Sequence, residues 1–245
     1  MMKKTVIITG AARGIGRATA ELFAAHHCNV LINYHRSVDA AQQLYHSLTE
    51  QGLSVELFKA DVTRRPEVEA MVAFCQQRFG QIDLLINNAG IAQSRLFIDL
   101  TDEDWQTMIN TNLTAVFYCT QAVLRRMIPQ KKGKTINIAS IWGQVGASCE
   151  VHYSAAKAWL IGLTKALAKE VGPSNIQVNC IAPGIIETAM LTPYNAEEKA
   201  VLKEQTPLER FGTPEEVAAC ALFLASDAAD FITGQVIGVN GGFVV

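Results

Sequence analysis

Seven short runs of β-branched and other apolar residues alternate along the chain with longer amphipathic stretches. A strand that is apolar almost throughout buries both of its faces, which is typical of parallel sheets covered by helices on each side. The pattern therefore predicts a doubly wound α/β fold with about six helices. The predicted strands are "KTVIITG", "NVLINY", "VELFKAD", "IDLLINNAG", "KTINIAS", "IQVNCIAPG" and "GQVIGVNGG".

The topology of such a sheet also predicts where a ligand binds. Crossovers between parallel strands are right-handed, so the carboxyl ends of the strands meet at one edge of the sheet, and ligands bind there. The stretch 185–212 follows the sixth predicted strand and includes a short helical pattern, so we expect it to form a substrate lid over this edge. No repeat or linker divides the chain, and we predict a single domain over 1–245.

The composition restricts the partners and the compartment. The chain has 245 residues, 49% of them hydrophobic, and a formal net charge of −2, which gives no general attraction to nucleic acid or to a membrane surface. The apolar run in "MMKKTVIITG" is too short for a signal peptide or a membrane span. The six cysteines are scattered in apolar contexts, which indicates buried free thiols in a cytoplasmic protein, and no His or Cys cluster has metal-ligand spacing.

A glycine-rich loop, "TGAARGIG", joins the first predicted strand to a helix and contains Gly10, Gly14 and Gly16. Glycines at this place let the backbone approach a diphosphate, and the helix N-terminus favours its negative charge. The spacing is G-x-x-x-G-x-G rather than G-x-G-x-x-G, and a tight turn alone also uses glycine. The loop therefore indicates, but does not by itself establish, a dinucleotide site.

The end of the second strand indicates which dinucleotide binds. An acid at this place accepts a hydrogen bond from the adenosine 2′-hydroxyl of NAD, whereas a cation pairs with the 2′-phosphate of NADP. The segment "LINYHRS" has Asn33 in place of the acid, followed by His35, Arg36 and Ser37. Arg13 in the glycine loop can supply a second guanidinium. We predict NADP(H), since a merely solvated Arg36 would leave Arg13 unexplained.

Tyr153 and Lys157 in "YSAAK" are four residues apart, so a helix places both on one face, and the alanines between them leave room for a ligand. An isolated pair at this spacing is more typical of a half-buried phenol and a solvated ammonium than of a shared ligand site. His152 points about 100° away from Tyr153 on a helix, so we expect it at a subunit contact or at the pocket rim. Cys149 has no activating base and is not expected to be a nucleophile.

Six motifs decide between these readings: "TGAARGIG", "NNAG" (87–90), Asn112 in "NTNL", Ser140 in "NIASIWG", "YSAAK" and "APG" with Pro183 and Gly184. In this order and at this spacing they resemble the short-chain dehydrogenase/reductase family over essentially the whole chain. The resemblance implies a Rossmann-type sheet of seven parallel strands in the order 3-2-1-4-5-6-7. It also implies a homotetramer.

The resemblance further implies a set of cofactor contacts. Asp61 and Val62 would flank the adenine. Asn88, Ala89 and Gly90 would line the cofactor near its ribose, and Ile186 and Thr188 would hold the carboxamide end. Tyr153 and Lys157 would also touch the cofactor. The other implied contacts lie in the glycine loop, after the second strand and in "APG": Gly10, Arg13, Gly14, Ile15, Gly16, His35, Arg36, Ser37, Pro183 and Gly184.

The chemistry of ketone reduction assigns roles to four residues. Hydride delivery leaves an alkoxide that Tyr153 can protonate, and because a free phenol has a pKa of about 10, a cation is needed to adjust it. We expect Lys157 to lower the pKa of Tyr153 and to bond the nicotinamide ribose. Ser140 can donate to the substrate oxygen, and the resemblance implies that Asn112 holds a water between Lys157 and solvent. This complete set argues against a cofactor sensor without turnover.

Among the branches of the family, "CIAPGIIETAM" and "PLERFGTPEEVA" look most like bacterial 3-oxoacyl-[acyl-carrier-protein] reductases. The implied reaction is NADPH-dependent reduction of a β-keto thioester in fatty acid synthesis. An acidic acyl carrier protein would need a basic docking surface, which "RRMIPQKKGK" could provide near the site, although cations at a helix end are also common. Its cations are Arg125, Arg126, Lys131, Lys132 and Lys134. Ser174 stands where the reductases carry a second basic docking position.

The stretch from Ser140 to Lys157 keeps an alternative open. It resembles a branch proposed to reduce a 5-aminopentanone group on a modified lysine of elongation factor P. We expect Trp142, Ser148, Cys149 and Glu150 near the substrate mouth, where the Glu150 carboxylate could pair with an amine. The other interpretation of Glu150 is an exposed acid at a helix N-terminus. A third alternative, oxidation of another secondary alcohol with NAD, is disfavoured by Arg13 and Arg36.

Overall fold

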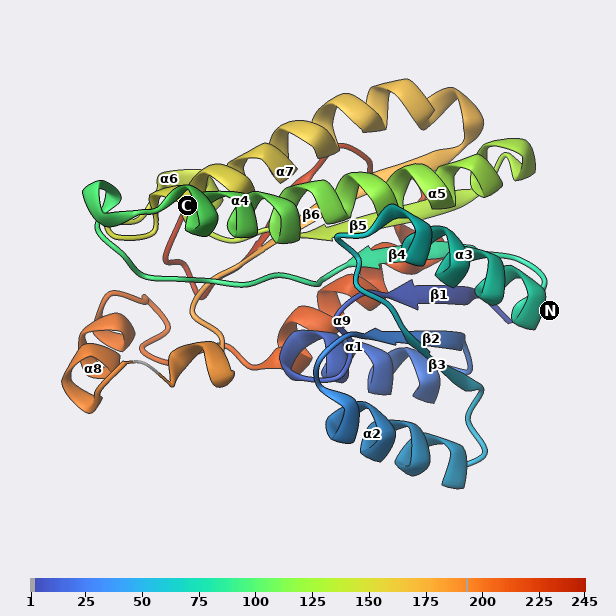
Figure 1. Ribbon diagram of the computed structural model, residues 1–245, viewed down its shortest axis with the longest axis horizontal. Helices are drawn as coiled ribbons and strands as arrows, with labels where there is room; N and C mark the ends of the chain where they lie inside the picture. Colours follow the sequence, from blue (N-terminus) through green and yellow to red (C-terminus); the bar gives the residue numbers. More distant parts are fainter. Residues whose placement is uncertain (1–2, 193) are drawn as a thin grey trace.

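The computed structural model describes residues 3–192 and 194–245, and one parallel sheet of seven strands forms its centre (Figure 1). The strand order is β3-β2-β1-β4-β5-β6-β7, and every neighbouring pair is parallel. This confirms the predicted fold and the implied strand order. The strands are β1 (Thr5–Ile8), β2 (Asn29–Tyr34), β3 (Val55–Lys59), β4 (Leu84–Asn87), β5 (Gly133–Ile138), β6 (Ile176–Pro183) and β7 (Val236–Val239). Met1, Met2 and Pro193, which belong to the predicted ranges 1–245 and 185–212, lie outside the described residues.

Helices cover both faces of the sheet (Figure 1). One core packs α1 (Gly14–Ala25), α2 (Val38–Glu50) and α9 (Pro214–Ala225) against the sheet through side chains such as Phe23, Leu44 and Leu224. The other core packs α3 (Arg65–Phe79), α5 (Ala115–Gln130) and α7 (Val151–Val171) through Met71, Val123 and Val171. Within the described residues, no helix combines the length and the apolar character that crossing a membrane would require.

The helical segment before β5 contains an irregular turn. The helix α4 (Asp102–Ile109) continues through a π-helical turn, Asn110–Thr114, into α5 without leaving the helical region. Counting this segment as one, the described residues contain six helical segments of 12 or more residues, the predicted number, and two shorter helices, Trp142–Val145 and Ala196–Glu204. Single π turns within α-helices occur frequently at functional sites. This turn carries Asn112.

The central strands are covered on both faces, and apolar residues predominate in β1, β4 and β6, whereas β5 also buries Lys134, Thr135 and Asn137. All residues of β1, β4, β5 and β6 are buried. Strands of this kind read in the sequence as continuous apolar runs rather than as alternating ones. Because such a run is visible in a short stretch of sequence, the positions of these strands can be predicted from the sequence. The residues that each strand contacts depend on the whole fold and cannot be predicted in this way.

The strand order reverses between β1 and β4, and this is where the site is built. The loops after these two strands diverge at the carboxyl edge and leave a crevice between them. The glycine loop follows β1, and the segment with Asn88 and Gly90 follows β4. Ser140 follows β5 at the same edge, while Tyr153 and Lys157 reach it from α7.

The segment 185–212 leaves the sheet after β6 and returns to it before α9. Its two ends are joined, because Ile186 and Gly212 form a parallel bridge in which the Gly212 amide donates to the Ile185 carbonyl at 2.9 Å. Between them lie a 3-10 turn (Ala189–Leu191) and α8 (Ala196–Glu204). In Figure 1, α8 stands apart from the sheet beside its carboxyl edge.

Candidate active site

A cavity of ≈ 400 Å³ opens at the carboxyl edge of the sheet, and it brings together Asn112, Ser140, Tyr153 and Lys157. All four side chains are buried. They come from the π-helical turn, the end of β5 and the first turns of α7. The cavity continues between the glycine loop and the segment 185–212, where Ile15, Gly184 and Thr188 line it.

Tyr153 and Lys157 lie on one face of α7, as their spacing predicted. The Lys157 ammonium donates to the carbonyl of Ile138 on β5 at 2.8 Å and lies 5.7 Å from the centroid of the Tyr153 ring. The glycine at position 143 allows this packing, because a Cβ there would come within 2.6 Å of the Lys157 backbone. The pair is therefore held by the contact between α6 (Trp142–Val145) and α7.

Burial controls the protonation of both groups. Burial raises the pKa of Tyr153 to about 12, while a side-chain hydrogen bond with Ser140 acts in the opposite direction. Burial also lowers the pKa of Lys157 to about 8. The net shift of the Tyr153 pKa is upward, opposite to the expected lowering by Lys157, because burial outweighs the other contributions and the ammonium is bonded to the Ile138 carbonyl.

Asn112 and Ser140 are fixed by backbone groups. The Asn112 side chain accepts from the Ile91 amide at 3.1 Å and donates to the Ile91 carbonyl at 3.0 Å. A Cβ at Gly90 would lie 2.6 Å from Oδ1 of Asn112 and 3.4 Å from Nζ of Lys157, so only glycine leaves these two groups room. The Ser140 hydroxyl accepts from the Trp142 amide at 3.1 Å and has one hydrogen to donate, either to the Tyr153 oxygen or to a ligand.

The glycine loop fits a diphosphate. The helix α1 begins at Gly14, and its N-cap residue Arg13 makes no side-chain cap, so the amides of the first turn are free of side-chain partners. Gly10 and Gly14 have φ angles of +63° and +53°. A Cβ at Gly16 would lie 2.5 Å from the Gly10 carbonyl oxygen and from the Asn88 amide nitrogen. The turn thus presents bare backbone donors and a helix dipole, which is the environment a phosphate prefers.

The groups after β2 fit a 2′-phosphate better than a free 2′-hydroxyl. Asn33 is buried and bonded to backbone, since it accepts from the Gly10 amide at 3.2 Å and donates to the Ala60 carbonyl at 3.1 Å. It supports the loop rather than facing a ribose. Arg13 and Arg36 are exposed, and neither is ion-paired within the part of the chain that the structure describes.

The other residues implied as cofactor contacts lie along the same edge. Those that line the cavity are Ile15, Asn88, Gly90, Pro183, Gly184, Ile186 and Thr188. Those outside its lining belong to the glycine loop, the ends of β2 and β3, and the start of the β4 loop: Gly10, Arg13, Gly14, Gly16, His35, Arg36, Ser37, Asp61, Val62 and Ala89. His35 Nδ1 lies 3.9 Å from the Asp61 carboxylate, so the two loop ends approach each other.

Glu150 lies inside the cavity lining, and the interpretation of it as an exposed helix-end acid is wrong. Only 8% of the residue is exposed, and it makes no side-chain cap on α7. Burial raises the pKa of Glu150, and the Tyr194 hydroxyl donates to its Oε1 at 3.5 Å. Trp142 also lines the cavity, whereas Ser148 and Cys149 do not.

Sequence reasoning missed Gln93, Met190, Tyr194, Glu198 and Leu202, which also line the cavity. Four of them belong to the segment 185–212, whose length was the only signal. Gln93 lies in the loop after β4, and nothing in its local sequence marks it. His152, expected at a rim or a subunit contact, is buried, and its Nε2 lies 3.2 Å from Oε1 of Gln93.

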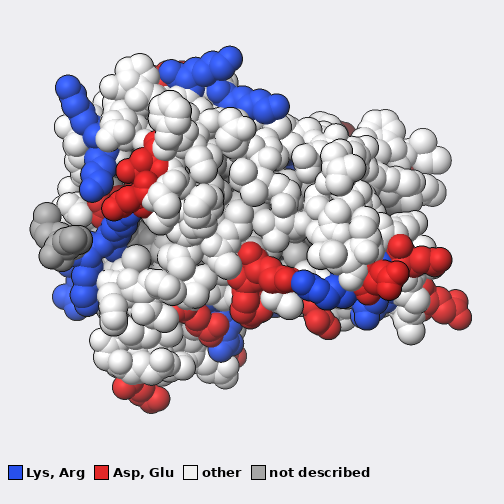
Figure 2. Space-filling model, turned by 180° about the vertical axis from the view of Figure 1, so that it is seen from behind, with Lys and Arg blue, Asp and Glu red and all other residues white. Residues whose placement is uncertain are grey.

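The basic stretch 125–134 is not at the site, which corrects the expected docking surface. The helix α5 runs opposite to the strands, so its end and the start of β5 lie at the amino edge of the sheet (Figure 1). Lys134 is buried there and donates to the Ser226 carbonyl at 2.7 Å. Figure 2, seen from behind, shows Lys and Arg side chains gathered at this end of the molecule.

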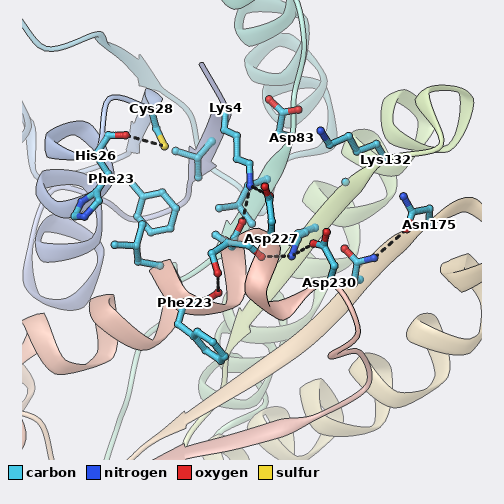
Figure 3. A pocket seen from close by; sticks show the side chains of 18 of the residues that line it. Lys4, Phe23, His26, Cys28, Asp83, Lys132, Asn175, Phe223, Asp227 and Asp230 are labelled. Atoms are coloured by element: carbon cyan, nitrogen blue, oxygen red, sulfur yellow. Dashed lines mark hydrogen bonds and ion pairs between the residues drawn. The ribbon is translucent and has the colours of Figure 1, made fainter. Parts of the chain in front are cut away.

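A larger cavity of ≈ 650 Å³ lies at the amino edge (Figure 3). Four of its charged groups, Lys4, Lys134, Asp227 and Asp230, form two ion pairs. Lys4 donates to the Ala225 carbonyl at 3.1 Å and pairs with Asp227, and Lys134 pairs with Asp230. These lysines satisfy carbonyls at the end of α9, which is a stabilising role.

Three of the six thiols are less buried than predicted. Cys28, Cys149 and Cys220 are only partly buried, so the prediction that all six thiols are buried was wrong for these three. Cys28 also lines the cavity at the amino edge.

Comparison with known proteins agrees with this geometry. A family model described as enoyl-(acyl carrier protein) reductase matches residues 10–244. A 3-oxoacyl-[acyl-carrier-protein] reductase of Chlamydia trachomatis is 44% identical over 243 residues, covering 99% of this chain and 98% of the relative. Reductases of the same name from a Synechocystis species and from Thermotoga maritima are 43% and 42% identical, covering 99% of this chain and 97% and 98% of the relatives.

Proposed function

The chain belongs to the short-chain dehydrogenase/reductase family, and we propose that it reduces a 3-oxoacyl thioester on acyl carrier protein to the 3-hydroxyacyl thioester, with NADPH as the reductant. It is an oxidoreductase acting on CH–OH groups. The observation that carries the proposal is the convergence of Asn112, Ser140, Tyr153 and Lys157 in one cavity next to the glycine loop. The names of its relatives supply the thioester and the carrier protein.

Each of the four residues has a distinct task in this proposal. The nicotinamide cofactor supplies the hydride when it is bound. Ser140 donates to the carbonyl oxygen as negative charge develops there, and Tyr153 then protonates the oxygen. Because burial raises the pKa of Tyr153 to about 12, the phenol is protonated at neutral pH and is ready to donate in the direction of reduction.

Lys157 and Asn112 support this transfer. The ammonium, with a pKa of about 8, is still charged at neutral pH and favours the phenolate that forms when Tyr153 gives up its proton. Asn112 is buried beside Gly90, and we propose that it holds a water through which the phenol regains a proton from solvent.

The preference for NADPH is part of the proposal. Two exposed guanidinium groups, Arg13 in the glycine loop and Arg36 after β2, belong to the segments expected to meet the adenosine ribose, and Asn33 is bonded to backbone. Arginine forms bidentate hydrogen bonds with phosphate, which a free 2′-hydroxyl cannot accept in the same way. The arrangement supports NADPH over NADH.

The segment 185–212 is proposed as the substrate lid of a single domain that spans 1–245. It supplies Met190, Leu191, Tyr194 and Leu202 to the cavity wall, and its ends are tied together by the bridge between Ile186 and Gly212. A lid with a fixed base can move its central part without disturbing β6 or α9. The apolar side chains it offers suit an acyl chain.

A homotetramer in the cytoplasm completes the proposal. Trp105, Phe117 and Trp159 are large apolar side chains that remain exposed on α4, α5 and α7, and such surfaces are typical of subunit contacts. All six cysteines are free thiols in the structure, which suits a reducing compartment.

A second candidate function is favoured by one observation, the charge of the cavity. Glu150 and Glu198 line it, and its one cation within the described lining, Lys157, is bonded to Ile138. A buried carboxylate without a cationic partner suits a ketone that carries a primary amine, as in the 5-aminopentanone group of elongation factor P. A neutral acyl chain carries no positive charge that would offset the cost of burying this carboxylate.

The experiment that tests both candidates is NADPH consumption with a short 3-oxoacyl thioester and, in parallel, with a ketone bearing a primary amine. The Tyr153→Phe protein serves as the blank. A higher kcat/KM for the thioester supports the first candidate, and a higher value for the amine supports the second. Absence of turnover with both, in protein that binds NADPH, would overturn the proposal.

A further inference from the structure

Gln93, which lines the cavity together with Tyr153, is tied to α7 by a partly buried hydrogen bond with His152. We propose that His152 is a positioning residue that locks the Gln93 amide in one orientation, and that Gln93 contacts a carbonyl group of the substrate next to the ketone. This inference deepens the proposed function and rests on it for the identity of the substrate.

The two ends of the Gln93 amide are assigned by their partners. Gln93 Nε2 lies 2.7 Å from Oδ1 of Asp104, and Oε1 lies 3.2 Å from Nε2 of His152. A carboxylate only accepts, so the amide hydrogens face Asp104 and the amide oxygen faces His152. The imidazole must then donate from Nε2, which leaves Nδ1 without a proton. In the described residues that buried Nδ1 has no partner.

Asp104 is itself immobilised, so the orientation of Gln93 is set from both sides. Its carboxylate caps α4 by accepting from the amide and the hydroxyl of Thr101, at 3.0 and 2.7 Å, and it pairs with Arg95. The backbone amide of Arg95 donates to the Cys149 carbonyl at 2.7 Å, one turn before the phenol. The wall after β4 is thus attached to the start of α7 by two bonds, one from a side chain and one from the backbone.

Gln93 retains hydrogen-bonding capacity that the protein does not use. An amide has two hydrogens and two lone pairs, and the bonds to Asp104 and His152 take one of each. Gln93 lines the cavity together with Tyr153, so the second hydrogen is available to a ligand there. The thioester carbonyl of a 3-oxoacyl substrate is an acceptor of the required kind, and it lies two carbons from the reacting ketone.

We call the hydrogen bond between His152 and Gln93 the clamp. Its chemistry also explains why the residue next to the catalytic tyrosine is a buried histidine. An asparagine or serine at this position is too short to present a donor as far from the helix as Nε2 does, and a leucine presents none. Glutamine places its amide nitrogen at a similar reach. The pair of variants His152→Leu and His152→Gln therefore separates the donor from the volume of the side chain.

The test measures KM and kcat for a short 3-oxoacyl thioester in His152→Leu, His152→Gln, Gln93→Leu and the double Leu variant. We expect His152→Leu and Gln93→Leu each to raise KM roughly 3- to 10-fold, the effect of one lost hydrogen bond, with NADPH affinity unchanged. His152→Gln should restore the parental KM. In the double variant the two effects should not multiply. Gln106→Leu, which removes an exposed hydrogen-bonded glutamine from α4, is the matched control.

Hydrogen exchange of the segment 91–100 gives a readout that does not depend on turnover. We expect faster exchange in His152→Leu than in the parental protein and parental exchange in His152→Gln. Parental KM and exchange in His152→Leu, or multiplied effects in the double variant, would overturn the proposed clamp. If the parental protein reduces no thioester, the proposed function fails, while the exchange comparison still decides whether His152 fixes the wall.

Discussion

The Lys157 ammonium lies one turn below the Tyr153 phenol on α7 but donates to the Ile138 carbonyl on β5. The lysine therefore joins the helix that carries Tyr153 to the strand that ends beside Ser140. This bond fixes the start of α7 relative to the end of β5. The electrostatic effect on the phenol is secondary to burial, which raises the pKa of Tyr153 to about 12.

Replacing Tyr153 with Phe should lower kcat by about 10²- to 10⁴-fold, the contribution typical of a general acid. The ring is buried among apolar groups, including Met108 and Ala156. The substitution removes only the hydroxyl, so the packing of the ring should remain intact. NADPH affinity, measured by fluorescence titration, should change little. Retention of most of the turnover would show that another group protonates the substrate oxygen.

Replacing Arg36 with Ala should weaken NADPH binding and spare NADH. The guanidinium is exposed and free of ion pairs among the described residues, so its loss should cost about 1.5–3 kcal/mol for each charge-assisted bond to the 2′-phosphate. Titration of the variant with both cofactors measures this difference. Arg17→Ala, which removes a guanidinium that pairs with Glu21 on α1, is the control. Equal losses for the two cofactors would contradict a role in reading the phosphate.

The sequence predicted the strands, the glycine loop and the shared face of Tyr153 and Lys157, because each depends on a local period or a local turn. Features that depend on distant packing were missed. The helical angle of His152 was predictable, but its partner Gln93 is 59 residues away in a loop of irregular structure. The raised pKa of Tyr153 and the lowered pKa of Lys157 follow from burial that only the folded chain defines.

The basic stretch 125–134 is a different kind of miss. Parallel topology alone requires the end of α5 and the start of β5 to lie at the amino edge, opposite the site. The error came from judging the stretch by its charge without following the direction of the helix.

The stability of the protein should depend on pH through Lys157. Burial lowers its pKa from 10.5 to about 8 in the folded state, so between these values the unfolded chain binds more protons than the folded one. Stability contributed by this group is therefore complete above about 10.5 and is lost as the pH falls toward 8. Urea unfolding can measure the free energy of unfolding of the parental protein and of Lys157→Met. As the pH rises from about 8 to about 10.5, the value for the parental protein should increase relative to that of the variant. A constant difference would mean that Lys157 titrates normally.

Replacing Glu150 with Gln should separate substrates by charge. The variant keeps the shape of the side chain and an acceptor for the Tyr194 hydroxyl, but it removes the negative charge from the cavity. A ketone that carries an ammonium should lose the equivalent of one charge-assisted hydrogen bond, about 1.5–3 kcal/mol, in kcat/KM. The kcat/KM for a neutral 3-oxoacyl thioester should be unchanged or slightly higher. In the variant, binding of this substrate no longer has to remove water from a charged carboxylate.

The pH dependence of this effect supplies a second check on Glu150. Because burial raises the pKa of its carboxyl, the charge is lost at a higher pH than for an exposed glutamate, and the ammonium-bearing ketone should bind progressively less well as the pH falls through that range. Glu150→Gln should abolish this dependence. Glu197→Gln, on the exposed surface of α8, removes a charge from the same edge of the molecule and should leave it in place. If both variants behaved alike, the summed charge of several acidic residues rather than contact with Glu150 would account for any preference between the two ketones.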